Sequence, residues 1–267
     1  MAPSQDAAAA PLRALIWDVD GTLAETERDG HRVAFNDAFA SMGLPWRWSV
    51  ERYGVLLSTS GGLERLQRDL AERDDAPRSA LERLALAREL HRRKNAAYPR
   101  RVDAGAIGLR PGVRRLMQEA RDAGALMAIA TTTGRANVEA LLSRQLGAAW
   151  ADAFAVLLCA EDAPQKKPHP QVYALALQRL ALRPHEAIAV EDSPNGLASA
   201  RAAGIEVLLT RSAYFESCDA ADALVACNGL DAPALARRVP EVPRVHWPWL
   251  CDVHRRALRT RAAAALH

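Results

Sequence analysis

Short apolar runs alternate with amphipathic segments along most of the chain. The first run, LRALIW at residues 12–17, has the length and composition of a strand buried in a parallel sheet. Beyond GLRPG at 108–112 the alternation is regular, and it predicts strands at 126–130, 154–158, 187–190 and 206–209, with helices from Val113, Asn137 and Pro170 and over 194–203. This order predicts an α/β fold whose core is a doubly wound, Rossmann-like parallel sheet with helices on both faces.

The segment between about 30 and 100 has a different pattern. Apolar side chains recur at helical spacing in three groups, which are Phe35, Phe39 and Met42, then Leu63, Leu66 and Leu70, then Leu81 and Leu84 continued by Arg88 and His91. A helical block after a first strand indicates a smaller inserted domain. The predicted division is a disordered Ala-rich tail at 1–11, a core domain at 12–28 and 105–239, a small α-helical cap at 29–104, and an atypical tail at 240–267.

Polar side chains follow the predicted strands at the points where they end. They are Asp18 and Asp20 after the first strand, then Thr131, Thr132 and Thr133, then the loop at 161–167 with Lys166 and Lys167, then Glu191, Asp192 and Ser193. Ligands of open α/β sheets bind outside the carboxyl ends of the strands. We therefore expect these groups to converge on one edge of the sheet.

The chemistry of this set favours phosphoryl transfer. Carboxylates from Asp18, Asp20, Glu191 and Asp192 suit Mg²⁺, whereas zinc is not expected, because none of these groups is a histidine or a cysteine. A lysine with threonine hydroxyls can hold a phosphate. Asp18 fits the role of a nucleophile that forms an aspartyl-phosphate, and Asp20 that of the general acid and base. The alternative is that DVDGT is a solvated turn after a strand.

Composition narrows the class of protein. Of the 267 residues, 49% are hydrophobic and 25% charged, and the net charge of +3 is small, so we expect a soluble protein that binds no nucleic acid. Four cysteines without a C-x-x-C pair argue against a zinc or redox site and favour a reducing cytoplasm. No run of about 18 apolar residues occurs, so no membrane span is expected. No obligate protein partner is inferred.

The motifs resemble those of the haloacid dehalogenase-like hydrolase superfamily. They are DVDGT at 18–22, Thr131 after LMAIA, the lysine of QKKP, and EDSPNG at 191–196, and the resemblance covers residues 12 to about 235. It implies that Asp18 is the nucleophile, Asp20 the acid and base, and Thr131 and Lys167 the phosphate binders. It also implies Mg²⁺ bound by Asp18, by Asp192, by the backbone carbonyl of Asp20 and, through water, by Glu191. Lys166 stays an alternative to Lys167.

Within that superfamily the helical insert is similar to the cap of β-phosphoglucomutase and phosphoglycolate phosphatase, and the chain most resembles the CbbY group. AETE at 24–27, HRVAFN at 31–36, STSGG at 58–62, HRRK at 91–94 and TTTGRAN at 131–137 carry this likeness. It implies removal of the 1-phosphate of xylulose 1,5-bisphosphate, in support of the Calvin cycle. The implied substrate contacts are Glu27, Ser58, Thr59, Ser60, Gly61, Gly62, His91, Lys94, Thr131, Thr132, Thr133, Arg135 and Asn137. The alternatives are a sugar phosphomutase and a phosphoglycolate phosphatase.

Several residues of the predicted cap have two possible roles. A bisphosphate needs a second anion site, and His91 and Lys94, three apart on a helix, can face it together; the alternative is a solvated basic face. Arg65 is either an anion contact or an exposed helix residue, and His31 either gates proton transfer or packs the hinge. The segment after residue 240 is Arg-rich without apolar periodicity, and the alternatives are a disordered or irregular tail, an oligomer contact, or sequence that is not the native continuation.

Overall fold

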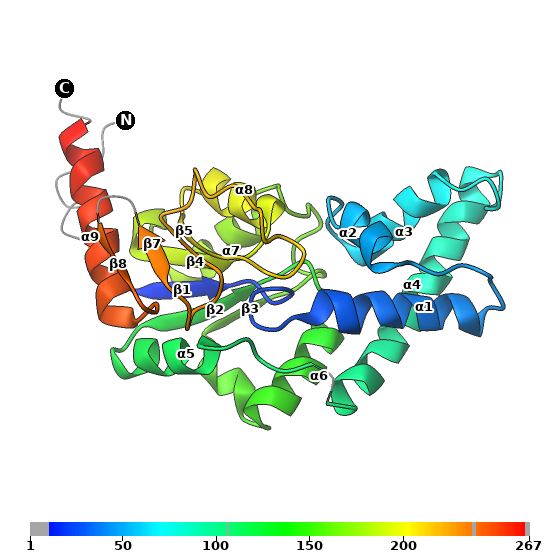
Figure 1. Ribbon diagram of the computed structural model, residues 1–267, viewed down its shortest axis with the longest axis horizontal. Helices are drawn as coiled ribbons and strands as arrows, with labels where there is room; N and C mark the ends of the chain where they lie inside the picture. The colour runs from blue at the N-terminus through cyan, green and yellow to red at the C-terminus, as the bar shows by residue number, and fades with distance from the viewer. Residues whose placement is uncertain (1–10, 106, 237–238, 265–267) are drawn as a thin grey trace.

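The computed structural model describes residues 11–105, 107–236 and 239–264, so all but the last residue of the predicted disordered tail lies outside the described residues. Figure 1 shows two lobes, with the sheet and its helices on the left and a helical lobe formed by α1–α4 on the right. The chain crosses between them twice, near the predicted boundaries at 28–29 and 104–105. Those boundaries stay a prediction.

The larger lobe, which we call the core, is built on one mixed sheet of eight strands in the order β3-β2-β1-β4-β5-β6-β7-β8. Strands β1 to β6 are parallel, and β7 and β8 are antiparallel additions at one edge. The bounds are β1 Ala14–Trp17, β2 Leu126–Ala130, β3 Val156–Leu158, β4 Ala187–Glu191, β5 Glu206–Thr210, β6 Val225–Cys227, β7 Ala234–Ala236 and β8 Val239–Val242. The predicted α/β fold class is confirmed, and β1 is fully buried because helices cover both of its faces.

Two apolar clusters cover the two faces of the sheet. Leu15 and Trp17 of β1 pack with α5, α6 and α9, whereas Ala14 and Ile16 pack with α7 and α8, as expected from the alternation of side chains along a strand. The helices are α5 Val113–Asp122, α6 Arg135–Leu146, α7 Gln171–Leu180, α8 Pro194–Ala202 and α9 Trp247–Ala264. Among the helices that the structure describes, none has both the length and the apolarity to cross a membrane.

The smaller lobe, which we call the cap, has its own apolar cluster. A π-helical turn at Glu27–His31 leads into α1 Arg32–Ser41, followed by α2 Val50–Leu56, α3 Gly62–Ala71 and α4 Ala80–Asp103. Phe35, Phe39 and Trp48 pack together in its centre with ring centroids 4.7 to 5.1 Å apart. The predicted apolar face of α4 is wrong at its first position. Leu81 is 76% exposed, and the buried face of α4 instead carries Ala87, Leu90, Lys94, Ala97, Tyr98 and Val102.

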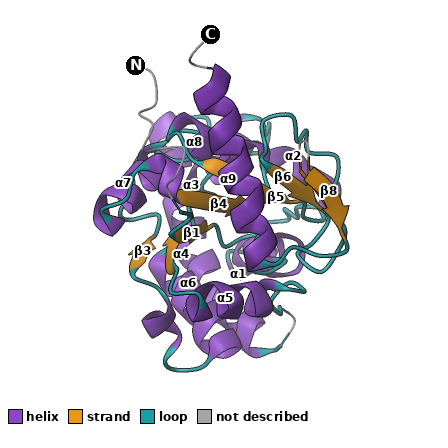
Figure 2. Ribbon diagram, turned by 90° about the vertical axis from the view of Figure 1, so that its left-hand side faces the viewer, coloured by secondary structure: helices purple, strands orange, loops and turns teal. Residues whose placement is uncertain are grey.

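The chain beyond residue 240 differs from the predicted irregular tail. After β8 it forms α9, which lies at the end of the sheet remote from the cap (Figures 1 and 2). Trp247, Leu250 and Val253 of this helix are buried in the cluster that includes α5, and the backbone N–H of Trp247 donates to Glu119 over 2.8 Å. The first half of the helix therefore extends the apolar cluster on the α5 face of the sheet, and Arg261 in its last turn pairs with Glu206 at the start of β5.

Docking of α9 buries a titratable group, which makes stability depend on pH. His254 is 1% exposed, and burial, together with the nearby His185 and Arg261, lowers its pKa to about 4. A histidine that titrates lower when folded leaves stability unaffected above its unfolded pKa and reduces it as the pH falls towards the folded pKa. Between pH 6.5 and 4 we therefore expect His254 to remove up to about 3 kcal/mol from the free energy of unfolding.

Replacing this histidine should remove that part of the pH dependence. In His254→Phe, chemical denaturation at pH 7.5 and 4.5 should show a smaller loss of stability between the two pH values than in wild type. His169→Phe, at an exposed position, is the control and should keep the wild-type loss. If His254→Phe loses as much unfolding free energy between pH 7.5 and 4.5 as wild type, the His254 side chain does not titrate differently in the folded and unfolded states.

Candidate active site

A lysine joins two carboxylates at the carboxyl edge of the sheet. The Lys167 Nζ donates to Asp18 Oδ1 over 2.7 Å and to Glu191 Oε1 over 2.6 Å, and all three residues are buried. Asp18 follows β1, Glu191 ends β4, and Lys167 comes from the loop after β3. These three side chains therefore converge at the carboxyl edge of the sheet, as the sequence predicted. Lys166 instead donates to the carbonyls of Ala160 and Ala163, over 2.5 and 3.0 Å.

Three carboxylates form a cluster with the geometry of a cation site. Oxygen atoms of Asp18, Glu191 and Asp192 all lie within 4.8 Å of one another. Burial and the neighbouring carboxylates raise the pKa of Asp18 to about 7, although Lys167 opposes this rise. Burial, Asp18 and Glu191 likewise raise the pKa of Asp192 well above its usual value. An excess of buried negative charge of this kind favours a divalent cation, and an all-oxygen donor set fits Mg²⁺.

Two glycines make room for these carboxylates. A Cβ on Gly21, where φ is +81°, would stand 2.1 Å from Asp192 Oδ2, and a Cβ on Gly196 would stand 1.9 Å from Glu191 Oε2. Distances below about 3 Å do not occur between such atoms. Both positions therefore require glycine if the carboxylates are to keep their places.

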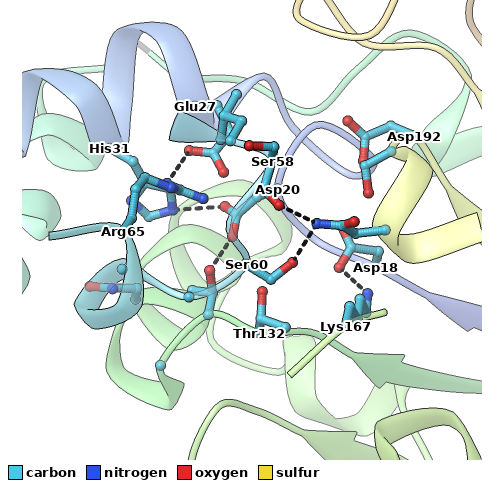
Figure 3. Close-up of a pocket in the computed structure, with 18 of the residues that line it drawn as sticks. Asp18, Asp20, Glu27, His31, Ser58, Ser60, Arg65, Thr132, Lys167 and Asp192 are labelled. Atoms are coloured by element: carbon cyan, nitrogen blue, oxygen red, sulfur yellow. Dashed lines mark hydrogen bonds and ion pairs between the residues drawn. The ribbon is translucent and has the colours of Figure 1, made fainter. Parts of the chain in front are cut away.

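Asp20 is held by hydroxyl and imidazole donors rather than by the lysine. Its Oδ1 accepts from Thr26 Oγ1 over 2.5 Å and lies 2.9 Å from His31 Nε2, and its Oδ2 accepts from Thr133. Figure 3 shows Asp20 pointing to His31 and away from Lys167. Although burial opposes ionisation, His31 and these hydrogen bonds hold the pKa of Asp20 well below its usual range. The pKa values of the two aspartates, two residues apart, are thus shifted in opposite directions.

A cavity of about 220 Å³ lies between the core and the cap, with the carboxylates at its floor (Figure 3). Most predicted site residues line it, namely Asp18, Asp20, Glu27, Ser58, Ser60, Gly61, Gly62, His91, Lys94, Thr132, Thr133, Asn137, Lys167 and Asp192. Both lobes contribute polar groups, so a ligand in this space is enclosed by both.

The cap side of the cavity carries a buried network around Tyr53. Its hydroxyl donates to Glu27 Oε2 over 2.5 Å and accepts from Arg65 Nη1 over 2.6 Å. Arg65 is 7% exposed and lies 3.6 Å from the Glu27 carboxylate. This distance leaves the guanidinium loosely paired. Of the two readings for Arg65, the structure thus excludes the exposed one.

Two further basic groups face the same space. Lys94 is 5% exposed, its Nζ lies 5.3 Å from the ring centroids of Phe35 and Tyr98, and its hydrogen bond to Asn95 Oδ1 is long, at 3.3 Å. Burial lowers the pKa of Lys94 to about 8 and that of His91 to about 4. The helix therefore buries Lys94 and turns its neighbours Arg92 and Arg93 outwards to Glu89.

Four predicted site residues do not line the cavity. Arg135 pairs with Asp162 over 2.8 Å, because the start of α6 directs its side chain along the core surface. Thr131 lies behind its two neighbours, and its Oγ1 accepts from the N–H of Thr133. The Thr59 hydroxyl accepts a hydrogen bond from Arg68, and Glu191 accepts one from Lys167, which itself lines the cavity.

Four further residues take part in the site and were not predicted from the sequence. Tyr53 organises the cap network, Tyr173 donates to Glu191 Oε1 over 2.5 Å, and Asn95 accepts from Asn137 across the two lobes over 3.1 Å. Asn195 of α8 donates to the carbonyl of Ser58 and the hydroxyl of Ser60 in the cap, both over 3.1 Å. Only Asn195 had a signal in the sequence, since it lies inside EDSPNG.

Known proteins share these features. A family model described as haloacid dehalogenase-like hydrolase matches residues 12–204. Protein CbbY of Rhodobacter capsulatus is 45% identical over 232 residues, which are 87% of this chain and 99% of the relative. Two solved structures of CbbY from Rhodobacter sphaeroides, one with phosphate and one of a mutant in complex with xylulose 1,5-bisphosphate, each have a TM-score of 0.76 and 38% identity, over 82% of this chain and 94% of theirs.

Proposed function

The chain belongs to the haloacid dehalogenase-like hydrolase family, and we propose that within it the substrate is xylulose 1,5-bisphosphate. The enzyme is a phosphatase, that is, a hydrolase of phosphoric monoesters. Removal of the 1-phosphate leaves xylulose 5-phosphate, and the biological setting we propose is support of the Calvin cycle. The solved CbbY complex with this bisphosphate supports the choice of substrate.

One observation carries the proposal. On its core side the cavity holds the carboxylates and Lys167, and under the cap it has a separate pair of cations, Arg65 and Lys94, with the neutral imidazole of His91 beside them. A bisphosphate has two anionic ends, and an enclosed site for it must neutralise both. Because Arg65 and Lys94 are buried and only loosely paired, they are available to the second phosphate.

The residues of this chain suggest a two-step reaction. Asp18 attacks phosphorus while the leaving sugar oxygen takes a proton from Asp20, and Asp20 then takes a proton from the water that hydrolyses the aspartyl-phosphate. Lys167 and the 131–133 loop hold the phosphate oxygens. With its present donors Asp20 is ionised, which suits the second step, so the first requires it to give up part of its contacts with Thr26, His31 and Thr133.

The cofactor we propose is Mg²⁺, because its preferred ligands are the oxygens that this site supplies. Asp18, Asp192 and the Asp20 carbonyl would hold it directly and Glu191 through water. When bound, it neutralises charge between the nucleophile and the incoming phosphate. The cluster of three buried carboxylates supports this assignment.

Product analysis tests the proposed reaction. With Mg²⁺, xylulose 1,5-bisphosphate should yield one equivalent of inorganic phosphate, and ³¹P NMR should show xylulose 5-phosphate as the remaining ester. An isomeric phosphate without net release would instead support the sugar phosphomutase. Faster release from phosphoglycolate than from the bisphosphate would support the phosphoglycolate phosphatase.

Selectivity tests the second anion site. Lys94→Met should lower kcat/KM for the bisphosphate at least tenfold more than for a sugar monophosphate, since only the bisphosphate has a second charged end. Arg135→Met is the matched control, because Arg135 pairs with Asp162 outside the cavity. Equal loss on both substrates in Lys94→Met would contradict the assignment of Lys94 to the second phosphate.

A further inference from the structure

Arg110 lies where the chain returns from the cap to the core, and the proposed reaction gives it no role. Its side chain is 7% exposed and has acceptors from two segments, 21–25 and 210–211. Nη1 donates to the carbonyl of Gly21 and, over 2.8 Å, to that of Thr210, and Nη2 donates to the carbonyl of Arg211 over 2.5 Å. A buried guanidinium is stable only with such partners, so this geometry is fixed by several bonds at once.

The Gly21 contact connects Arg110 to the reaction centre. Gly21 directly follows Asp20, and the Asp192 carboxylate occupies the space where a Gly21 side chain would stand. Its N–H donates to the Ala24 carbonyl over 2.8 Å. Gly21 is therefore held by Arg110 on its carbonyl, by Ala24 on its N–H and by the Asp192 carboxylate beside its Cα.

The same arginine also joins the two crossings between the lobes. Its Nε lies 3.2 Å from Glu25 Oε1 on the first crossing, and its backbone N–H donates to the Leu23 carbonyl over 2.8 Å. Ala24 and Leu109 form an antiparallel bridge beside it. Arg110 therefore connects both crossings to the Gly21 carbonyl.

We propose that Arg110 is a positioning residue for the phosphatase reaction, which fixes the main chain at Gly21 so that Asp20 stands in place to protonate the leaving oxygen. The inference rests on the proposed role of Asp20 as the general acid. It predicts an effect that depends on the leaving group, because a sugar oxygen needs that proton whereas p-nitrophenolate does not.

The test compares kcat/KM on two substrates, since this quantity reports the steps up to formation of the aspartyl-phosphate. In Arg110→Lys one ammonium can reach Glu25 or one carbonyl but cannot serve all acceptors. We expect kcat/KM for xylulose 1,5-bisphosphate to fall by at least about 30-fold and that for p-nitrophenyl phosphate by less than about 3-fold, since a misplaced acid loses part of the roughly 10²- to 10⁴-fold contribution of general acid catalysis.

Arg115→Lys is the matched control. Arg115 also pairs with a carboxylate and a carbonyl, those of Asp231 and Leu230, but it lies on α5 away from Gly21. It should keep both values within about twofold of wild type, as expected for a surface pair. An equal loss on both substrates in Arg110→Lys, or no loss on either, overturns the proposal.

A second variant covers the case that Arg110→Lys does not fold. Glu25→Gln leaves Arg110 in place but removes the charge on the first crossing, and it should show the same direction of difference between the substrates at a smaller size. If wild type does not hydrolyse the bisphosphate, the proposed function fails, and the comparison is repeated with β-glucose 1-phosphate as the sugar phosphate. If Arg110→Lys then loses more kcat/KM on β-glucose 1-phosphate than on p-nitrophenyl phosphate, the role of Arg110 is supported independently of the proposed substrate.

Discussion

Asp18→Asn should lose phosphate release from xylulose 1,5-bisphosphate by at least about 10⁴-fold, the scale expected when a nucleophile is removed. The amide keeps the shape of the carboxylate but cannot form an aspartyl-phosphate. Folding should not suffer, because burial and the neighbouring carboxylates, opposed by Lys167, raise the pKa of Asp18 to about 7, so the ionised side chain is already disfavoured in the folded protein. Lys167 also keeps its bond to Glu191 over 2.6 Å.

Two measurements make this prediction specific. Acid quenching of wild type during turnover of ³²P-labelled bisphosphate should leave label on the protein, whereas Asp18→Asn should carry none. Urea denaturation at pH 8 should give the variant a free energy of unfolding no lower than that of wild type. Asp152→Asn is the matched control on the core surface, and it should keep both activity and label. Retention of more than about a hundredth of wild-type turnover would remove Asp18 from the role of nucleophile.

The core could be predicted because its local patterns and its topology agree. Strand β2 has the predicted bounds, since an apolar run between polar turns has no other stable place than the interior of a sheet. Once the strands are parallel, Asp18, Thr131 and Glu191 must share an edge. The sequence alone could not exclude Lys166 as the alternative to Lys167, because neighbouring residues in a loop can point in either direction. The packing of the 161–170 segment turns Lys167 inwards.

The cap could be predicted only in part, since its site depends on contacts between helices distant in sequence. Tyr53 meets Glu27 and Arg65 because three cap segments pack around Phe35, and no local pattern records this. Arg135 was expected in the site because it follows Thr131 closely, but a helix directs each side chain by rotation rather than by distance along the chain. In α9 the apolar face was obscured by arginines that alternate with it, which is why a helix was not predicted there.

After Asp18→Asn, Lys167→Met should have the largest effect on turnover, and it should also lower the free energy of unfolding. The Nζ lies 2.7 Å from Asp18, 2.6 Å from Glu191 and 3.5 Å from the Tyr173 hydroxyl. Its removal leaves the three clustered carboxylates without this cation, and breaking a buried pair in this way costs about 3–5 kcal/mol. We also expect kcat to fall about 10²- to 10³-fold, as when one donor to a reacting oxyanion is lost.

Magnesium separates these two effects. Because a divalent cation neutralises the same carboxylates, 10 mM Mg²⁺ should raise the melting temperature of Lys167→Met by more than that of wild type, while turnover stays low. Lys166→Met is the matched neighbour, and it should behave like wild type in both respects, since Lys166 bonds only the carbonyls of Ala160 and Ala163 among the described residues. The reverse result, with Lys166→Met inactive and Lys167→Met active, would transfer the phosphate-binding role to Lys166. An equal rise in melting temperature for Lys167→Met and wild type would mean that the lysine and the metal do not stabilise the same charges.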